Sequence, residues 1–242
     1  FSPKLNLYFT PNESLQFFLL SGKSFHSNDT RVVVAQNGKE ILPAAYGAEI
    51  GAHFKPLDKM FMSASLWGLY LQQEFVYVGD EAVVEASGAS QRVGIDLGIR
   101  YDINDWLYAD ADFNYAMPRA LGVANGENKI PLAPTVTSIG GLTIKTPIGI
   151  KTSFRYRYLG DRPANEDFSS IAKGYTLFDG IIEYSIKKTS FSLSAENIFN
   201  VKWNEAQFET ESRMKGEQTS VSEIHYTAGT PLFLKAKMVY NF

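Results

Sequence analysis

Apolar and polar residues alternate along most of the chain. At the C-terminal end, apolar residues occupy every second position from Leu232 to Phe242, with Lys235, Lys237 and Asn241 between them. A period of two is typical of a β-strand that has one apolar face. The pattern therefore predicts a strand at the C-terminus, in which the two lysines and Asn241 share the polar face.

The same alternation predicts ten further strands. In chain order they are Leu5–Phe9, Leu15–Phe25, Tyr46–Phe54, Met60–Tyr77, Val93–Tyr101, Leu107–Tyr115, Thr135–Lys145, Ile148–Tyr158, Tyr175–Ile186 and Phe191–Ala195. Short connections rich in turn-forming residues alternate with long polar connections. The long ones are His26–Pro43, Gly79–Gln91, Met117–Pro131, Gly160–Gly174 and Val201–Thr230. The chain is therefore expected to be all-β, an antiparallel meander of about eleven strands with short turns at one end.

Two architectures produce this pattern, a soluble β-sandwich or barrel and a transmembrane β-barrel. Aromatic residues favour the transmembrane β-barrel, because they gather near strand ends. Membrane barrels have such girdles of aromatic residues at the two membrane interfaces. The aromatic residues near strand ends are Phe9, Phe54, Tyr101, Tyr115, Tyr156, Tyr158, Tyr240 and Phe242. In the last strand we expect Leu232, Leu234, Ala236, Met238 and Tyr240 to face lipid, and the intervening polar residues to face the lumen.

An odd strand number has a consequence for closure. Single-chain barrels of bacterial outer membranes have an even number of antiparallel strands. With eleven strands, the first and last run in the same direction and cannot pair with each other in an antiparallel barrel. We therefore expect this sequence to be part of a larger barrel, with strands upstream of Phe1.

Composition narrows the function classes. The longest stretch without charge, Ile130–Ile144, is too short for a transmembrane helix, which needs about 20 apolar residues. The net charge is −3, from 23 basic and 26 acidic residues without a basic block, so we expect no nucleic-acid partner. There is no cysteine, which excludes disulfides, thiol nucleophiles and cysteine-ligated zinc.

Several short motifs resemble one family. They are Ser2-Pro3-Lys4-Leu5, the following Gly22-Lys23-Ser24-Phe25-His26, Tyr158-Leu159-Gly160-Asp161-Arg162-Pro163, Glu196-Asn197-Ile198-Phe199-Asn200, and the terminal Phe242 with Tyr240 and Met238 at alternate positions. In this order and spacing they resemble the C-terminal half of TonB-dependent outer-membrane receptors, and the resemblance covers essentially all 242 residues.

The resemblance implies a specific architecture. Such receptors have a 22-stranded barrel filled by an N-terminal plug, so residues 1–242 are expected to be the C-terminal part of the barrel. The plug, the first half of the barrel and the energy-coupling box do not occur in this sequence. The implied partners are outer-membrane lipid, the missing plug and strands, the TonB complex of the inner membrane reached through the missing segment, and a small-molecule ligand. The implied location is the outer membrane of a Gram-negative bacterium.

The sequence contains no catalytic or metal-binding motif. The three histidines, His26, His53 and His225, have neither the H-x-H nor the H-x-x-x-H spacing of a metal site. No G-x-S-x-G nucleophile elbow is present. We therefore expect no enzyme activity, no metal site and no cofactor, although His26 and His225 lie in long connections where they could contact an external metal chelate.

Charged residues on the expected lumen face suggest two roles. Arg155 and Arg157 occupy one strand, and carboxylates such as Asp110 and Asp112 occupy another. These charges can pair with each other and with the plug, or they can form a lining that steers an anionic ligand such as an iron chelate. Both roles remain open from the sequence.

The connection Val201–Thr230 combines aromatic and acidic residues. Trp203, Glu205, Phe208 and His225 all lie in it, and such groups on a mobile external loop could hold a ligand or simply shield the barrel mouth. With His26, Arg155 and Arg157, these four residues are the candidate ligand contacts.

The resulting functional hypothesis is an outer-membrane receptor that imports a scarce nutrient, above all a metal chelate such as a siderophore, by TonB-dependent gating of the plug. A passive pore or surface-binding barrel without energy coupling is the main alternative. A soluble β-rich adhesin is the third.

Overall fold

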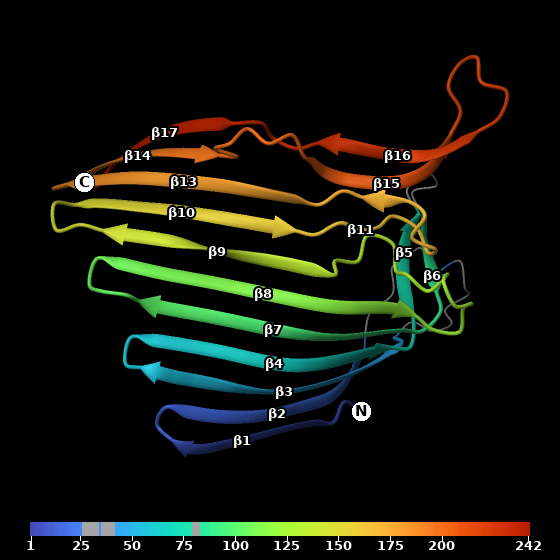
Figure 1. The fold of residues 1–242 in the computed structure, drawn as a ribbon, viewed down its shortest axis with the longest axis horizontal. Coiled ribbons are helices and arrows are strands. Elements are labelled where there is room, and N and C mark those ends of the chain that lie inside the picture. The colour runs from blue at the N-terminus through green and yellow to red at the C-terminus, as the bar shows by residue number, and fades with distance from the viewer. Residues whose placement is uncertain (26–33, 35–41, 79–82) are drawn as a thin grey trace.

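A computed structural model describes residues 1–25, 34, 42–78 and 83–242. It contains one large antiparallel sheet of eleven strands (Figure 1). The strands lie side by side in the order β1 (Lys4–Asn12), β2 (Leu15–Phe25), β3 (Ala44–Leu57), β4 (Met60–Leu71), β7 (Ser90–Asp102), β8 (Leu107–Ala120), β9 (Val136–Lys145), β10 (Ile150–Leu159), β13 (Tyr175–Ile186), β14 (Thr189–Glu196) and β17 (Phe233–Tyr240). The predicted all-β class and the predicted number of strands are confirmed. In the described part of the chain, no helix has the length and apolar character needed to cross a membrane.

The sheet does not close into a barrel, because β1 and β17 are its two edges. Every neighbouring pair is antiparallel, so β1 and β17 run in the same direction, as expected from the odd strand number. The strand ends joined by short turns lie at one end of the sheet, and the strand ends that lead into long connections lie at the other, on the left and right of Figure 1.

Polar side chains shape the short turns. The Asn104 side-chain oxygen accepts hydrogen bonds from the N–H groups of Trp106 and Leu107, at 3.0 and 2.9 Å. This satisfies two backbone donors where the chain leaves the sheet. A salt bridge of 2.6 Å between Lys59 and Asp105 joins two of these turns.

Six shorter strands lie within the long connections. They form three separate hairpins: β5 (Glu74–Val78) with β6 (Val83–Ser87), β11 (Arg162–Pro163) with β12 (Ile171–Ala172), and β15 (Asn204–Ser212) with β16 (Val221–Ala228). Figure 1 shows all three at the same end of the sheet.

One predicted strand is therefore wrong, and one predicted connection contains structure of its own. Met60–Tyr77 is not one strand, because β4 ends at Leu71, the chain bends at Gln72 and Gln73, and Glu74–Val78 forms β5, which pairs with β6 in a separate hairpin. Val201–Thr230 is a long connection between β14 and β17, as predicted, and most of it forms the β15–β16 hairpin.

The strand register separates the side chains onto two faces. Directly opposite residues in antiparallel strands share a face. On one face, which we call the apolar face, Leu19, Ile50, Leu66 and Ile95 pair in a continuous row across β2, β3, β4 and β7. The other, which we call the polar face, carries the charged residues of β7, β10, β13 and β17 and the two aspartates of β8.

The last strand follows the predicted separation. Ala236 lies opposite Leu193 on the apolar face, whereas Lys235 and Lys237 lie opposite Ser194 and Ser192 on the polar face. The predicted grouping of side chains in β17 is thus confirmed.

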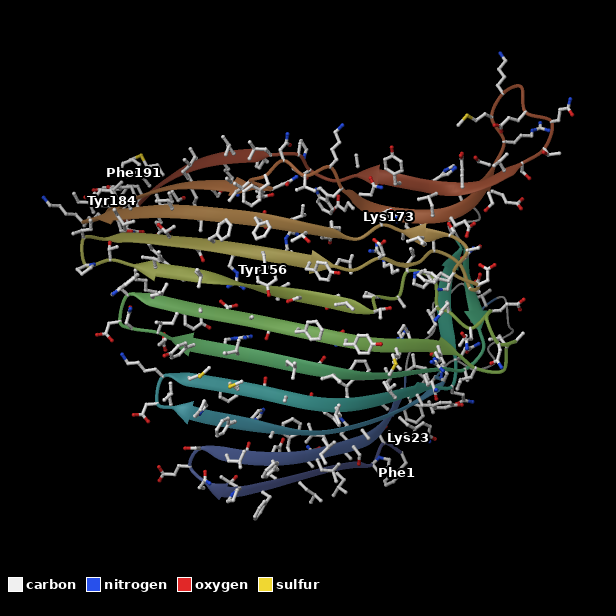
Figure 2. All side chains as sticks on the ribbon, viewed as in Figure 1. Phe1, Lys23, Tyr156, Lys173, Tyr184 and Phe191 are labelled. Carbon is white, nitrogen blue, oxygen red and sulfur yellow. The ribbon has the colours of Figure 1, made fainter. Side chains whose placement is uncertain are left out.

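Full burial occurs mainly where the long connections fold against the sheet. Leu177 and Ala172 have no exposed surface, and Gln207 is 2% exposed. Elsewhere the sheet is a single layer, and its apolar side chains remain uncovered, as for Leu234 at 60% exposed. Figure 2 shows these side chains projecting from the wall. A sheet with such an uncovered apolar face requires an apolar environment or another protein surface.

Candidate functional site

A bidentate ion pair on the polar face joins β8 to β10. Arg155 of β10 reaches across β9 to Asp110 of β8, and both guanidinium Nη atoms donate to the carboxylate, one of them at 2.8 Å. Asp110 is 8% exposed at its side chain. Gly141 of β9 lies between the partners, and a Cβ there would come within 2.9 Å of the Arg155 side chain. Because Gly141 has no side chain, the Arg155 side chain has space to cross β9.

A second ion pair on the polar face joins the adjacent strands β7 and β8. Arg100 of β7 donates to both carboxylate oxygens of Asp112 at 2.8 Å, and to the Ile99 and Ala111 carbonyls. Gly98 lies directly opposite Asp112, and a Cβ at this glycine would be 3.1 Å from the carboxylate. In both ion pairs a glycine lies beside the charged side chains, and each ion pair links two different strands of the sheet.

Asp179 of β13 has two partners. One carboxylate oxygen accepts from Arg157 Nε at 3.2 Å, and the other accepts from the backbone N–H of Asn197 at 2.9 Å. Asp179 therefore links β10 to the segment that follows β14.

These contacts confirm that the arginines on the polar face pair with carboxylates of the same sheet. The lysines of β17 differ. Lys235 and Lys237 are exposed, and neither forms an ion pair with any residue that the structure describes. The polar face is thus neutralised over β7 to β13 and cationic at its β17 edge.

Two asparagines organise the start of the long connection after β14. Asn197 and Asn200 both have a φ of 50°, in the left-handed region that asparagine tolerates better than most residues. The buried Asn197 side chain donates to the carbonyls of Val201 and Thr230, at 2.8 and 3.1 Å, and accepts from the Val201 N–H at 2.8 Å. One amide therefore holds together both ends of the connection that carries the β15–β16 hairpin.

Trp203 packs at the base of this hairpin. Its indole Nε1 donates to the Thr230 carbonyl at 3.0 Å, and its ring meets Tyr175 edge-on at 4.7 Å between centroids. Gly229 leaves room for the ring, because a Cβ there would be 2.1 Å from an indole carbon. The indole N–H of Trp203 is thus already engaged within the protein.

Gln207 connects β15 to the segment that leads into β13 of the large sheet. Its side-chain oxygen accepts from the Lys173 N–H at 2.9 Å, and its side-chain nitrogen donates to the Lys173 carbonyl at 2.8 Å, just before β13 (Figure 2). The neighbouring N–H of Gly174 donates to Asp161 at 2.7 Å. This hydrogen bond lowers the pKa of Asp161 below its ordinary value, and Lys173 adds to the effect.

Comparisons with known proteins identify this architecture. The family model described as "TonB dependent receptor-like, beta-barrel" matches residues 1–201, most of the chain. The chain belongs to this receptor family. The resemblance deduced from the sequence motifs is therefore confirmed. Comparison with curated proteins gave no match.

Solved structures show the same receptor fold. The ferric-catecholate import receptor Fiu from E. coli K12, in its closed form, is 15% identical with a TM-score of 0.72. The ferric citrate transporter FecA, unliganded, is 14% identical with a TM-score of 0.76. The copper transporter OprC is 15% identical with a TM-score of 0.76.

This receptor chain corresponds to only part of those proteins. It is covered over 98%, 98% and 100% of its length in the three comparisons, but it spans 34%, 38% and 40% of Fiu, FecA and OprC. Members of the family are outer-membrane proteins that act as receptors and transporters.

The predicted ligand contacts of the receptor fall into two groups. Arg155 and Arg157 lie on the same face of β10. Phe208 and His225 lie directly opposite each other in the hairpin, and the exposed His225 ring contacts Ser212 at 3.1 Å. Glu205 is exposed on β15. His26 lies outside the described residues. In the part that the structure describes, no three His, Asp or Glu side chains are grouped to hold a metal ion.

Three residues that shape the receptor were not among the predicted site residues. Asn197 was recognisable only as part of a family motif. Gly141 and Gln207 carry no sequence signal of their own, because each acts through a partner far away in the chain. The tertiary register alone reveals them.

Replacing Asn197 with alanine is expected to release the base of the hairpin. The substitution removes three hydrogen bonds and places a residue less suited to positive φ, so we expect local destabilisation of about 2 kcal/mol or more. Hydrogen exchange at Val201 should become faster. Asn104→Ala, which removes a similar side-chain cap at the opposite end of the sheet, serves as control and should leave this exchange unchanged. Equal protection of Val201 in both variants would contradict the role of Asn197.

Proposed function

We propose that residues 1–242 form the second half of a 22-stranded barrel in an outer-membrane receptor of a Gram-negative bacterium. The receptor imports a scarce nutrient, a metal chelate of the siderophore type. Passage requires a plug, outside this chain, which the TonB complex of the inner membrane displaces.

The observation that carries this proposal is the division of an eleven-stranded wall into two chemically distinct faces in a chain of this family. An uncovered apolar face suits the hydrocarbon of a membrane, and a charged face suits a wet lumen. The half-barrel extent agrees with the share of the related receptors that the chain spans.

The ligand class rests on two further points. Two proteins of similar structure are a ferric-catecholate import receptor and a ferric citrate transporter. Within this chain, Lys235 and Lys237 leave positive charge on the lumen side, where it would attract an anionic chelate. His26, Glu205, Phe208 and His225 in the long connections are the proposed first contacts, with Arg155 and Arg157 deeper in the lumen.

Uptake by the intact receptor tests this proposal. Cells that lack other chelate receptors would be given radiolabelled ferric citrate, a ferric catecholate or copper, with and without a protonophore. Accumulation of one chelate that stops with the protonophore supports energy-coupled import. Accumulation that persists would support the alternative, a passive pore, and absence of uptake for every chelate would refute the proposed ligand class.

If the long connections lie outside the cell and the short turns lie in the periplasm, the accessible protease sites are defined. Arg213 and Lys215 are exposed between β15 and β16, whereas Lys187 and Lys188 lie in a short turn at the opposite end. Trypsin added to intact cells should cleave at Arg213 or Lys215 and spare the two lysines. Cleavage at these sites only after rupture of the outer membrane would reverse the orientation.

A further inference from the structure

The apolar face ends in a distinctive row beside the long connections. Lys23, Tyr46, Tyr70, Gln91 and Arg119 lie directly opposite one another across β2, β3, β4, β7 and β8. We call these five residues the rim row. Figure 2 shows Lys23 at this end of the sheet and Tyr184 and Phe191 at the other.

The rim row combines two cationic side chains with two tyrosines. The Lys23 ammonium lies 5.2 Å from the Phe25 ring centre and 5.6 Å from that of Tyr46, and the Tyr46 and Tyr70 rings are 6.1 Å apart. Arg119 is exposed. Neither cation has an ion-pair partner among the residues described.

The next row on the apolar face, toward the short turns, holds no acidic residue to neutralise the rim. It consists of Ser21, Ala48, Gly68, Val93 and Met117. Among the residues that the structure describes, these two cations on the apolar face have no counter-ion. Lysine and arginine at such a level of a membrane extend toward anionic headgroups.

An apolar groove lies directly below the rim row. Its volume is about 480 Å³, and its lining on the apolar face is Leu19, Ala48, Ile50, Leu66, Gly68, Val93, Ile95, Tyr115 and Met117. Ala48 and Gly68 lie side by side in the register and are much smaller than the residues around them. The depression exists because these two positions lack bulk.

We propose that the rim row and this groove together bind one membrane lipid that carries two phosphate groups. The phosphates contact Lys23 and Arg119, and an acyl chain occupies the groove. The inference rests on the proposed function, because it requires the apolar face to meet a membrane.

The spacing of the cations selects a doubly phosphorylated headgroup. Lys23 and Arg119 are four strand spacings apart, about 19 Å at the usual distance between neighbouring strands. A single phosphate cannot contact both, whereas two phosphates on one sugar headgroup can, one for each side chain. The tyrosines between them suit the interfacial level of the bilayer, where such amphipathic rings concentrate.

Native mass spectrometry of the purified intact receptor tests the inference. Diphosphoryl and monophosphoryl lipid A would be added in detergent, since they differ by one phosphate and share the rest of the molecule. We expect the diphosphoryl form to bind at least ten-fold more tightly. In the double variant Lys23→Gln, Arg119→Gln this preference should disappear, whereas Lys235→Gln, a lysine of the polar face, should leave it unchanged.

A groove variant separates the two halves of the site. At Gly68 an added Cβ would have its nearest neighbour, Val93 Cγ1, at 3.8 Å, so Gly68→Leu fills the groove without a backbone clash. It should weaken both lipids equally. An unchanged preference in the double variant, or equal binding of the two lipids to the original protein, would overturn the inference.

The outcome is distinguishable from failure of the proposed function. Heat-modifiable mobility and chelate uptake would be measured on the same variants. A double variant that folds, transports and keeps its lipid preference refutes the lipid site alone. A receptor that selects diphosphoryl lipid A but imports no chelate refutes the proposed transport and leaves the lipid site standing.

Discussion

Residues 1–242 expressed alone should give no energy-dependent uptake and no monomeric closed barrel. The edges of the sheet, β1 and β17, run in the same direction, so they cannot pair as neighbours in an antiparallel barrel. Each unpaired N–H or C=O group in hydrocarbon costs several kcal/mol, and a whole strand edge carries many of them. The expected loss of transport is complete.

Gel mobility and uptake check this expectation together. The 242-residue chain would be produced in a receptor-deleted strain beside the intact receptor. The intact receptor should show a heat-dependent mobility shift and restore uptake, and the shorter chain should do neither as a monomer. A monomeric, heat-modifiable chain that restored energy-dependent uptake would refute the argument.

Arginine at position 236 should strongly disfavour insertion. Ala236 lies on the apolar face near the middle of β17, opposite Leu193. A charge facing lipid near the bilayer centre costs about 2 to 4 kcal/mol, because it must lose hydration or distort the membrane. The free energy of unfolding of the intact receptor in liposomes should fall by this amount in Ala236→Arg.

The neighbouring position provides the matched control. Lys237 is on the polar face, so Lys237→Leu should change the free energy of unfolding by much less. If Lys237→Leu abolished folding while Ala236→Arg had no effect, the two faces would be assigned the wrong way round. The two variants together therefore test which face of the sheet meets lipid, since a shift of one residue in register moves every side chain to the opposite face.

The strands were predictable because their signal is local. Period-two alternation marked all eleven strands of the wall, and Tyr175–Ile186 was predicted with the bounds that the structure shows. The β15–β16 hairpin was missed because glutamates occupy one set of its alternating positions, so that the segment looked like a polar connection. Its pairing of Phe208 with His225 becomes visible only with both strands in place.

The candidate site was predictable in part. Pairing of the arginines with carboxylates was one of two roles that the sequence left open. The partners were not predictable, because Arg155 and Asp110 are brought together by the register of three strands. Similarly, Trp203 was considered as a ligand contact from its place in a long connection, and the structure places it against Tyr175.

The sequence by itself determined the strand class and the separation of faces, which depend on residues close together in the chain. It also determined the parity argument and the family resemblance, which depend only on the order of strands and motifs along the chain. The tertiary structure decided which charges neutralise one another, how Asn197 and Gln207 hold the hairpin, and that Lys23 and Arg119 belong to one row. The reason is physical. Strand formation follows from short-range alternation, whereas contacts between strands that are not consecutive in the chain depend on the registers of all the strand pairs between them.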